Sequence, residues 1–119
     1  MAANPAVPTP ALTLQTEKTP AEMVVRCTGN INSNTVDLLK STVRSLLLEN
    51  KIVVLDLGSV SYMDSSGLGA LVGLYISARR SGSSLKLVKL NDRLKELFSV
   101  ARLAPLFEGH EDMLGMTPD

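Results

Sequence analysis

The run Ile52-Val53-Val54-Leu55 lies near the middle of the chain and decides its fold class. The run is continuously apolar and is interpreted as a strand. A strand that is apolar on both faces is typical of the centre of a sheet covered by helices. We therefore expect a buried strand from Lys51 to Leu57, followed by a loop from Gly58 to Asp64.

The apolar residues on either side of this strand follow the period of a helix. Before it, Asn34 or Ser33 can cap a helix that ends at Asn50. The apolar positions of this first helix are Val36, Leu38, Leu39, Val43, Leu46 and Leu47. After the strand, a second helix is expected over residues 65–80, ended by Ser81-Gly82. Its core stripe is predicted to be Leu68, Leu71, Val72, Tyr75 and Ile76.

Shorter elements complete the chain on both sides. They are, in chain order, a strand over 11–15, a strand over 23–28 stopped by Gly29-Asn30, a strand over 85–88, a helix capped by Asp92, a strand at 106–107 and a helical turn over 111–116. The first two strands should pair antiparallel, and strands that alternate with helices imply a parallel sheet. The expected fold is a single α/β domain with a mostly parallel sheet, an antiparallel N-terminal strand and helices packed on the sheet.

Length and segment composition indicate one domain. With 119 residues the chain can bury one core but not two. Residues 1–10 carry three prolines and are predicted to be a flexible arm, so that the domain spans 11–119. The N-terminus lacks the basic and apolar regions of a secretory signal, and no apolar run approaches the ~18 residues of a membrane span. We therefore expect a cytoplasmic protein that does not bind a membrane.

Charge and reactive residues exclude several classes of function. Twelve basic residues balance twelve acidic ones, which argues against a nucleic-acid-binding surface. Cys27 is the single cysteine, so a disulfide within the chain and a cysteine metal site are excluded. His110 is also single and is interpreted as a solvated residue beside acidic neighbours. We expect neither metal nor cofactor. We also expect a monomer, because no long apolar edge is evident.

The densest group of functional residue types follows the central strand, in Met63-Asp64-Ser65-Ser66-Gly67-Leu68-Gly69. Loops that leave the carboxyl ends of parallel strands and enter helices commonly carry function. The simplest interpretation is structural: Asp64 or Ser65 caps the helix, and Gly67, Gly69 and Gly73 let it pack closely.

Two chemical alternatives match this segment less well. A dinucleotide fingerprint needs a glycine at the position of Val72, and the next strand lacks the acidic residue that binds ribose. A hydrolase elbow, G-x-S-x-G, needs a glycine at the position of Met63, and only His110 is available as a base.

A regulated serine explains the segment best. A phosphate on Ser65 would lie at a helix N-terminus, where unpaired N–H groups and the helix dipole favour negative charge. It would add about −1.5 to −2 charge. Asp64 and Asp56 would add to the negative field, and a partner bound to this face would be expelled. Ser66 and Gly67 complete the residues expected to flank the switch.

The sequence resembles the STAS family, and within it the stand-alone bacterial anti-sigma factor antagonists. Residues 53–57 and 61–69 resemble the defining segment of the family, and Thr28 to Asn32 resembles its second motif. The similarity spans roughly residues 12–110.

The resemblance implies a partner-switching cycle that regulates transcription. The unphosphorylated protein would bind an anti-sigma factor that is also a serine kinase, which frees the sigma factor. The kinase would use ATP to phosphorylate Ser65, the complex would dissociate, and a phosphatase would reset the protein. Ser65 is then a substrate, and the protein is not an enzyme.

The partner-binding face implied by the resemblance combines both motifs. Its expected residues are Asn30, Asn32, Ser33, Met63, Leu68 and Gly69, and for Met63 and Leu68 a place in the core is an equal alternative. Many family members carry acidic residues where this chain has Asn30 and Asn32, which bears on the choice of partner. Two other functions remain open: an unmodified STAS subunit of a transporter or stress-signalling assembly, and a small serine hydrolase.

Overall fold

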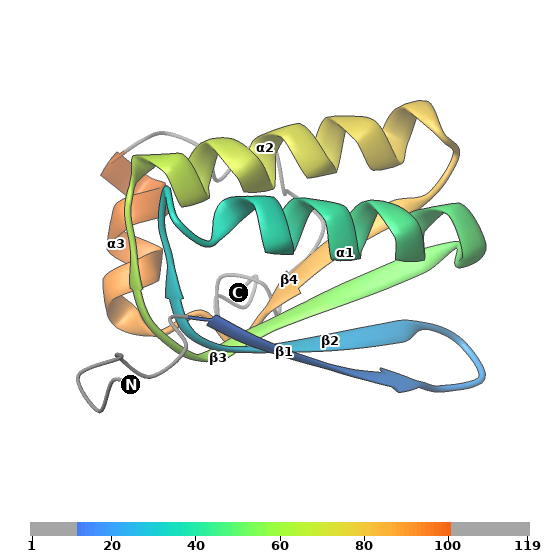
Figure 1. Cartoon of the computed structure of the whole chain (residues 1–119), viewed down its shortest axis with the longest axis horizontal. Helices are drawn as coiled ribbons and strands as arrows, with labels where there is room; N and C mark the ends of the chain where they lie inside the picture. The colour runs from blue at the N-terminus through green and yellow to red at the C-terminus, as the bar shows by residue number, and fades with distance from the viewer. Residues whose placement is uncertain (1–11, 101–119) are drawn as a thin grey trace, which may run out of the picture.

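The computed structural model describes residues 12–100, which form a mixed sheet and three helices (Figure 1). The strands are β1 (Leu12–Lys18), β2 (Met23–Ile31), β3 (Ile52–Met63) and β4 (Ser84–Val88), and they lie side by side in that order. β1 is antiparallel to β2, whereas β2, β3 and β4 are parallel. The expected sheet is confirmed. The elements predicted at 1–10, 106–107 and 111–116 lie outside the described residues.

The helices are α1 (Val36–Glu49), α2 (Ser65–Arg80) and α3 (Asp92–Val100). Figure 1 shows α1 and α2 side by side over one face of the sheet, while α3 stands across the end of the sheet where α2 begins. Parallel strands joined through helices bring the start of α1 and the start of α2 to this same end. Both predicted motifs therefore lie near α3.

The predicted loop from Gly58 to Asp64 is wrong, because β3 continues to Met63. β2 is also longer than predicted and does not stop at Gly29. Its last residues pair with the end of β3, Asn30 opposite Tyr62 and Ile31 opposite Met63. The β2–β3 register has two irregularities, which lie among the poor strand formers of this segment. Gly29 has a backbone φ of 114° there, which glycine adopts without steric cost. Pairing with a neighbouring strand has overridden the low strand propensity of glycine and serine.

The core is mostly aliphatic and lies between the sheet and the two long helices, with Leu94 and Phe98 of α3 buried at its end. Inward-facing strand residues include Val25, Cys27, Val53, Leu55, Leu57, Leu85 and Leu87. The predicted stripe of α2 is partly wrong. Leu68 and Leu71 are buried together with Ala70, Leu74 and Ala78, whereas Ile76 is 44% exposed. The small alanines let α2 approach the sheet closely, and the face that packs is rotated accordingly.

The helix ends follow the sequence rules with two changes. Asn50 ends α1 as predicted, and its backbone N–H donates to the carbonyl of Leu46. The predicted cap of α1 by Ser33 or Asn34 is wrong, since Thr35 occupies the N-cap position. Asn91 rather than Asp92 caps α3, because its side-chain oxygen accepts the N–H of Leu94 at 2.9 Å.

Candidate functional site

Asp64 fixes the start of α2. Its side-chain oxygen accepts the N–H of Gly67 at 3.1 Å, and its backbone carbonyl accepts the N–H of Leu68 at 3.1 Å. This is the hydrogen bonding of an N-cap residue, so the predicted capping is performed by Asp64. Ser65 therefore does not cap the helix. Its hydroxyl extends from the first residue of α2 into solvent.

The surroundings of Ser65 suit a negative group. The first N–H groups of a helix have no partner within the helix, and the helix dipole is positive at this end. The first turn of α2 contains no acidic residue. The one carboxylate next to Ser65 in the sequence is therefore that of Asp64. Ser66 is half-buried beside it. Since Asp64 accepts the N–H groups of Gly67 and Leu68, the N–H groups of Ser65 and Ser66 are the ones left for a phosphate on Ser65.

Gly67 is the point where three segments of the site meet. A Cβ at this position would lie 2.6 Å from Cγ of Met63 and 2.8 Å from Cγ2 of Ile31. It would also lie 2.8 Å from the carbonyl oxygen of Ile31. Only a glycine lets α2 approach the end of β2 so closely. Gly69 and Gly73 have open space at the same position, so the predicted close packing holds for Gly67 alone.

The end of β2 joins the two predicted motifs. Asn30 lies opposite Tyr62 in the β2–β3 register, and the N–H of Asp64 donates to the carbonyl of Ile31 at 3.2 Å. The segment that begins at Asn30 therefore adjoins the segment that carries Ser65. The structure thus brings together the two motifs that the sequence analysis placed on one surface.

The turn between β2 and α1 depends on Thr35, a buried residue that the sequence analysis missed. Its hydroxyl donates to the carbonyl of Asn30 at 2.9 Å and accepts the N–H of Asn32 at 2.9 Å. The side-chain oxygen of Asn32 accepts the N–H of Asn34 at 2.9 Å. Asn32 thus shapes its own turn, which leaves Ser33 exposed at the tip.

Two predicted contact residues belong to the core. Met63 is 4% and Leu68 8% exposed, and both belong to the hydrophobic cluster. Of the two alternatives left open for them, the structure favours the core. The exposed part of the predicted face consists of Ser33, Ser65 and Gly69, with Asn30 and Asn32 half-buried beside them. Tyr62 is exposed next to Asn30 and was missed, although the alternation of side chains along β3 points it outward.

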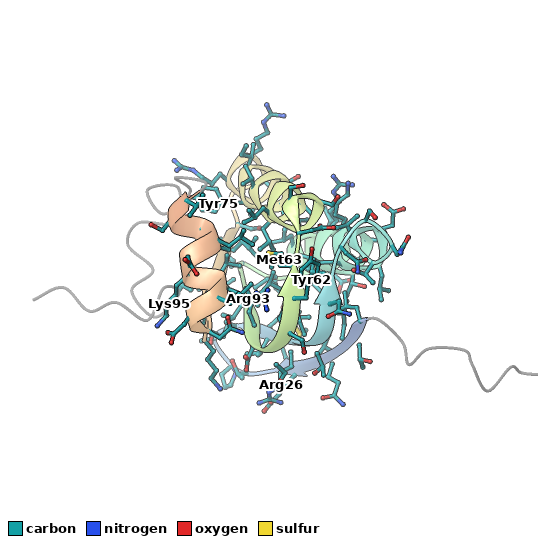
Figure 2. The ribbon with its side chains drawn as sticks, turned by 90° about the vertical axis from the view of Figure 1, so that its left-hand side faces the viewer. Arg26, Tyr62, Met63, Tyr75, Arg93 and Lys95 are labelled. Atoms are coloured by element: carbon teal, nitrogen blue, oxygen red, sulfur yellow. The ribbon has the colours of Figure 1, made fainter. Side chains whose placement is uncertain are left out.

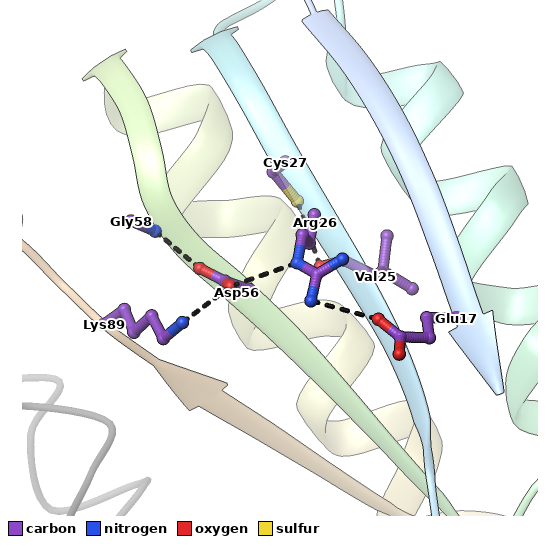
Figure 3. A network of polar contacts seen from close by, with 7 residues as sticks. All are labelled: Glu17, Val25, Arg26, Cys27, Asp56, Gly58 and Lys89. Atoms are coloured by element: carbon purple, nitrogen blue, oxygen red, sulfur yellow. Dashed lines mark hydrogen bonds and ion pairs between the residues drawn. The ribbon is translucent and has the colours of Figure 1, made fainter. Parts of the chain in front are cut away.

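Asp56 lies in a different polar cluster from Ser65 (Figure 3). Its carboxylate contacts Nζ of Lys89 at 3.4 Å and Nε of Arg26 at 3.8 Å, and it accepts the N–H of Gly58 at 2.9 Å. Arg26 continues to Glu17 at 3.0 Å. Asp56 is eight residues before Asp64 on a strand that rises about 3.3 Å per residue, so its carboxylate lies far from Ser65 and does not flank it as expected. Its contacts join β1, β2 and β3 across the face of the sheet opposite α1 and α2.

A groove of about 460 Å³ adjoins Ser65. Tyr62, Met63, Asp64 and Ser65 form one wall, and α3 supplies Arg93, Leu94, Glu96, Leu97 and Val100. Val100 is 76% exposed. Sequence reasoning missed this groove because tertiary packing alone places α3 beside the start of α2.

Cys27 is a buried residue of β2. Burial raises the pKa of its thiol to about 12, and the negative charge of Asp56 adds to the rise. The thiol is therefore protonated at neutral pH. Among residues 12–100 no group of three His, Cys, Asp or Glu side chains is placed to hold a metal ion. None of the helices described is long and apolar enough to cross a membrane.

The alternatives considered for the glycine-rich segment fare differently. Gly67 and Gly69 lie inside α2 rather than in a loop before it, so they do not form a dinucleotide-binding turn. His110, the base that a hydrolase would need, lies outside the described residues.

Comparison with known proteins agrees with this geometry. The family model described as STAS domain matches residues 13–113. The anti-sigma-B factor antagonist of Listeria monocytogenes is 40% identical over 81 residues, which cover 67% of this chain and 71% of the relative.

Solved structures show the same fold. An anti-sigma factor antagonist from Mycobacterium paratuberculosis superposes with a TM-score of 0.74 at 20% identity, over 82% of this chain and 83% of the other. The Bacillus cell fate determinant SpoIIAA in its phosphorylated form gives a TM-score of 0.63 at 20% identity, over 79% of this chain and 87% of the other.

Proposed function

This chain belongs to the STAS domain family, and we propose that it is an anti-sigma factor antagonist controlled by phosphorylation of Ser65. In the unphosphorylated state it binds an anti-sigma factor and so releases a sigma factor for transcription. The observation that carries the proposal is the position of Ser65. Its hydroxyl is exposed on the first residue of α2, beside the end of β2 that the family motif marks.

The anti-sigma factor in this proposal is itself a serine kinase. It transfers the γ-phosphoryl group of ATP to Oγ of Ser65, ADP leaves, and the hydroxyl proton is released to solvent. A phosphatase later hydrolyses the phosphate ester with water and restores the hydroxyl. The chain serves as a substrate in both steps and catalyses neither, and it acts in the cytoplasm as a monomer, without nucleic acid, membrane, metal or cofactor.

Electrostatics explains how one phosphate can expel a partner while the fold persists. The added charge of about −1.5 to −2 lies at the positive end of α2, where it is tolerated. A partner that contacts this face with apolar groups or its own acids would have to bury that charge or face repulsion. The neighbouring surface of Asn30, Asn32, Ser33 and Gly69 supplies polar and small contacts rather than charge. The identity of the bound partner therefore depends on hydrogen bonding and shape at these positions.

The proposal is tested by incubating the protein with its cognate anti-sigma kinase and Mg-ATP, followed by mass spectrometry of the intact chain and its peptides. We expect one phosphate, located on Ser65 and absent from Ser65→Ala. Ser66→Ala is the matched control, because it removes the adjacent hydroxyl and should still take up one phosphate. Phosphate on Ser66, or none with a kinase that binds the protein, would contradict the proposal.

The same samples separate the two rival functions. A STAS subunit of a larger assembly would bind its partners without taking up phosphate. A serine hydrolase would label at Ser65 with a fluorophosphonate probe, which the proposed function does not predict.

A further inference from the structure

The groove beside Ser65 has an uneven distribution of charge. Its lining includes the carboxylates of Asp64 and Glu96 and one basic side chain, that of Arg93. Lys95 on the same helix is held instead by Asp92, at 3.9 Å. A phosphate on Ser65 would add negative charge to a groove that already contains two carboxylates. Among residues 12–100, Arg93 is the one cation lining the groove that can offset it.

Arg93 is available for this task. None of the ion pairs within residues 12–100 involves it, and its side chain is exposed. Figure 2 shows Arg93 on the side of α3 that faces the end of β3, toward Tyr62 and Met63. The long, flexible stem of arginine allows its guanidinium to move within an open groove. Its planar donors match phosphate oxygens in a bidentate geometry that lysine lacks.

We propose that Arg93 is the intrachain partner of a phosphate on Ser65. The guanidinium crosses the groove, pairs with the phosphate oxygens and fills the space between α3 and the start of α2. Phosphorylation then changes the shape of the surface as well as its charge. When the groove is filled, the anti-sigma factor can no longer contact Tyr62, Leu97 and Val100 inside it. This inference rests on the proposed function in one respect, that Ser65 is the residue that becomes phosphorylated.

The test uses the full chain with phosphoserine incorporated at residue 65 during translation, so that no kinase is required. The second pKa of the phosphate, about 6 in the absence of neighbours, is measured by ³¹P NMR titration. A nearby guanidinium favours the dianion and lowers this pKa. We therefore expect the value in the otherwise unchanged protein to lie about half a unit to one unit below that in Arg93→Gln. The difference should shrink in about 1 M salt, which screens the pair.

Three further variants make the result specific. Arg93→Lys keeps the charge without the bidentate geometry and should restore part of the difference. Glu96→Gln removes a carboxylate from the same groove and should lower the phosphate pKa further. Arg44→Gln removes an exposed arginine that lines a separate groove between α1 and α2 and should leave the pKa unchanged.

Equal phosphate pKa values in the unchanged protein and in Arg93→Gln would overturn the inference. That result would leave the proposed function intact, since uptake of phosphate from the kinase is measured separately. Conversely, the shift in pKa can be observed even if the kinase assay fails, and the two failures are therefore distinguishable.

Discussion

Asp64, Ser65 and Gly67 have different roles at the start of α2. Asp64 holds the helix end with its carboxylate, which leaves the hydroxyl of Ser65 uncommitted. Gly67 lets the first turn approach the carbonyl of Ile31. The sequence alone predicted a cap, a switch residue and close packing. It could not tell that Gly67 is needed for the approach while Gly69 is not, because that distinction depends on the atoms of β2.

Gly67→Ala should destabilise the protein by about 1–3 kcal/mol, because the new methyl group would overlap Met63 and Ile31. Gly69→Ala is the control. Its methyl group meets open space on an exposed helical position, so the change should be neutral or stabilise by up to about 1 kcal/mol. Urea unfolding of the two variants measures both effects. Equal stability of the two would show that the approach of α2 to β2 is not tight.

Cys27 gives a prediction about alkaline pH. The pKa of its thiol is about 12 in the folded protein, against an ordinary value of 9.0. As the pH rises from 9 to 12, the unfolded chain loses the thiol proton first, so the free energy of unfolding decreases. The protonated thiol contributes its full stabilisation below pH 9. By pH 10.5 the free energy of unfolding should have fallen by about 1–2 kcal/mol for this reason.

Urea unfolding at pH 8 and pH 10.5 checks this prediction in the native sequence and in Cys27→Ala. The variant is expected to start from lower stability because it leaves a cavity, so the comparison concerns the change with pH. The native sequence should lose more stability than the variant over this interval. An identical loss in both would show that other groups account for the alkaline sensitivity.

Among the helices and strands, the turn from β2 to α1 is held by the buried hydroxyl of Thr35 together with hydrogen bonds to Asn32. Thr35 ties the carbonyl of Asn30 and the N–H of Asn32 together, and both asparagines border the surface that contains Ser65. Periodicity predicted the helix but not this arrangement, since Ser33 and Asn34 are equally good capping residues in sequence terms. Thr35 is distinguished by its hydrogen bonds to Asn30 and Asn32, which periodicity does not report.

Thr35→Val should destabilise the protein by about 1–3 kcal/mol, because it leaves partly buried backbone groups of Asn30 and Asn32 without the partner that the hydroxyl supplied. It should also weaken binding to the anti-sigma factor, since the turn that presents Ser33 loses its support. Thr42→Val, at a half-buried threonine in the middle of α1, is the matched control and should change neither property by much. Unfolding by urea and calorimetric titration with the partner give the two readouts. Unchanged binding in a destabilised Thr35→Val would separate this turn from the partner surface.

At the scale of the molecule, the order of elements within residues 12–100 and the mixed sheet followed from the pattern of apolar residues, because that pattern reports burial directly. The lengths of β2 and β3 did not, since their polar ends are strands only through pairing with each other. The groove beside Ser65 also escaped prediction, because its walls come from β3 and α3, which are brought together by the core. Asp56, expected close to Ser65, is separated from it because β3 continues past Asp56 to Met63, and its carboxylate contacts Arg26 and Lys89 instead.

The central claim is that a phosphate on Ser65 releases the partner. It is tested most directly by calorimetric titration of the anti-sigma kinase, held with ADP, against the chain with serine or phosphoserine at residue 65. Phosphoserine at Ser84 is the control, because Ser84 is exposed and pairs with Ile52, the first residue of β3, at the opposite end of that strand from Ser65. We predict that phosphate at 65 raises Kd at least about tenfold, or about 1.4 kcal/mol, while phosphate at 84 leaves it unchanged. Equal Kd values for the two forms of residue 65 would contradict the account.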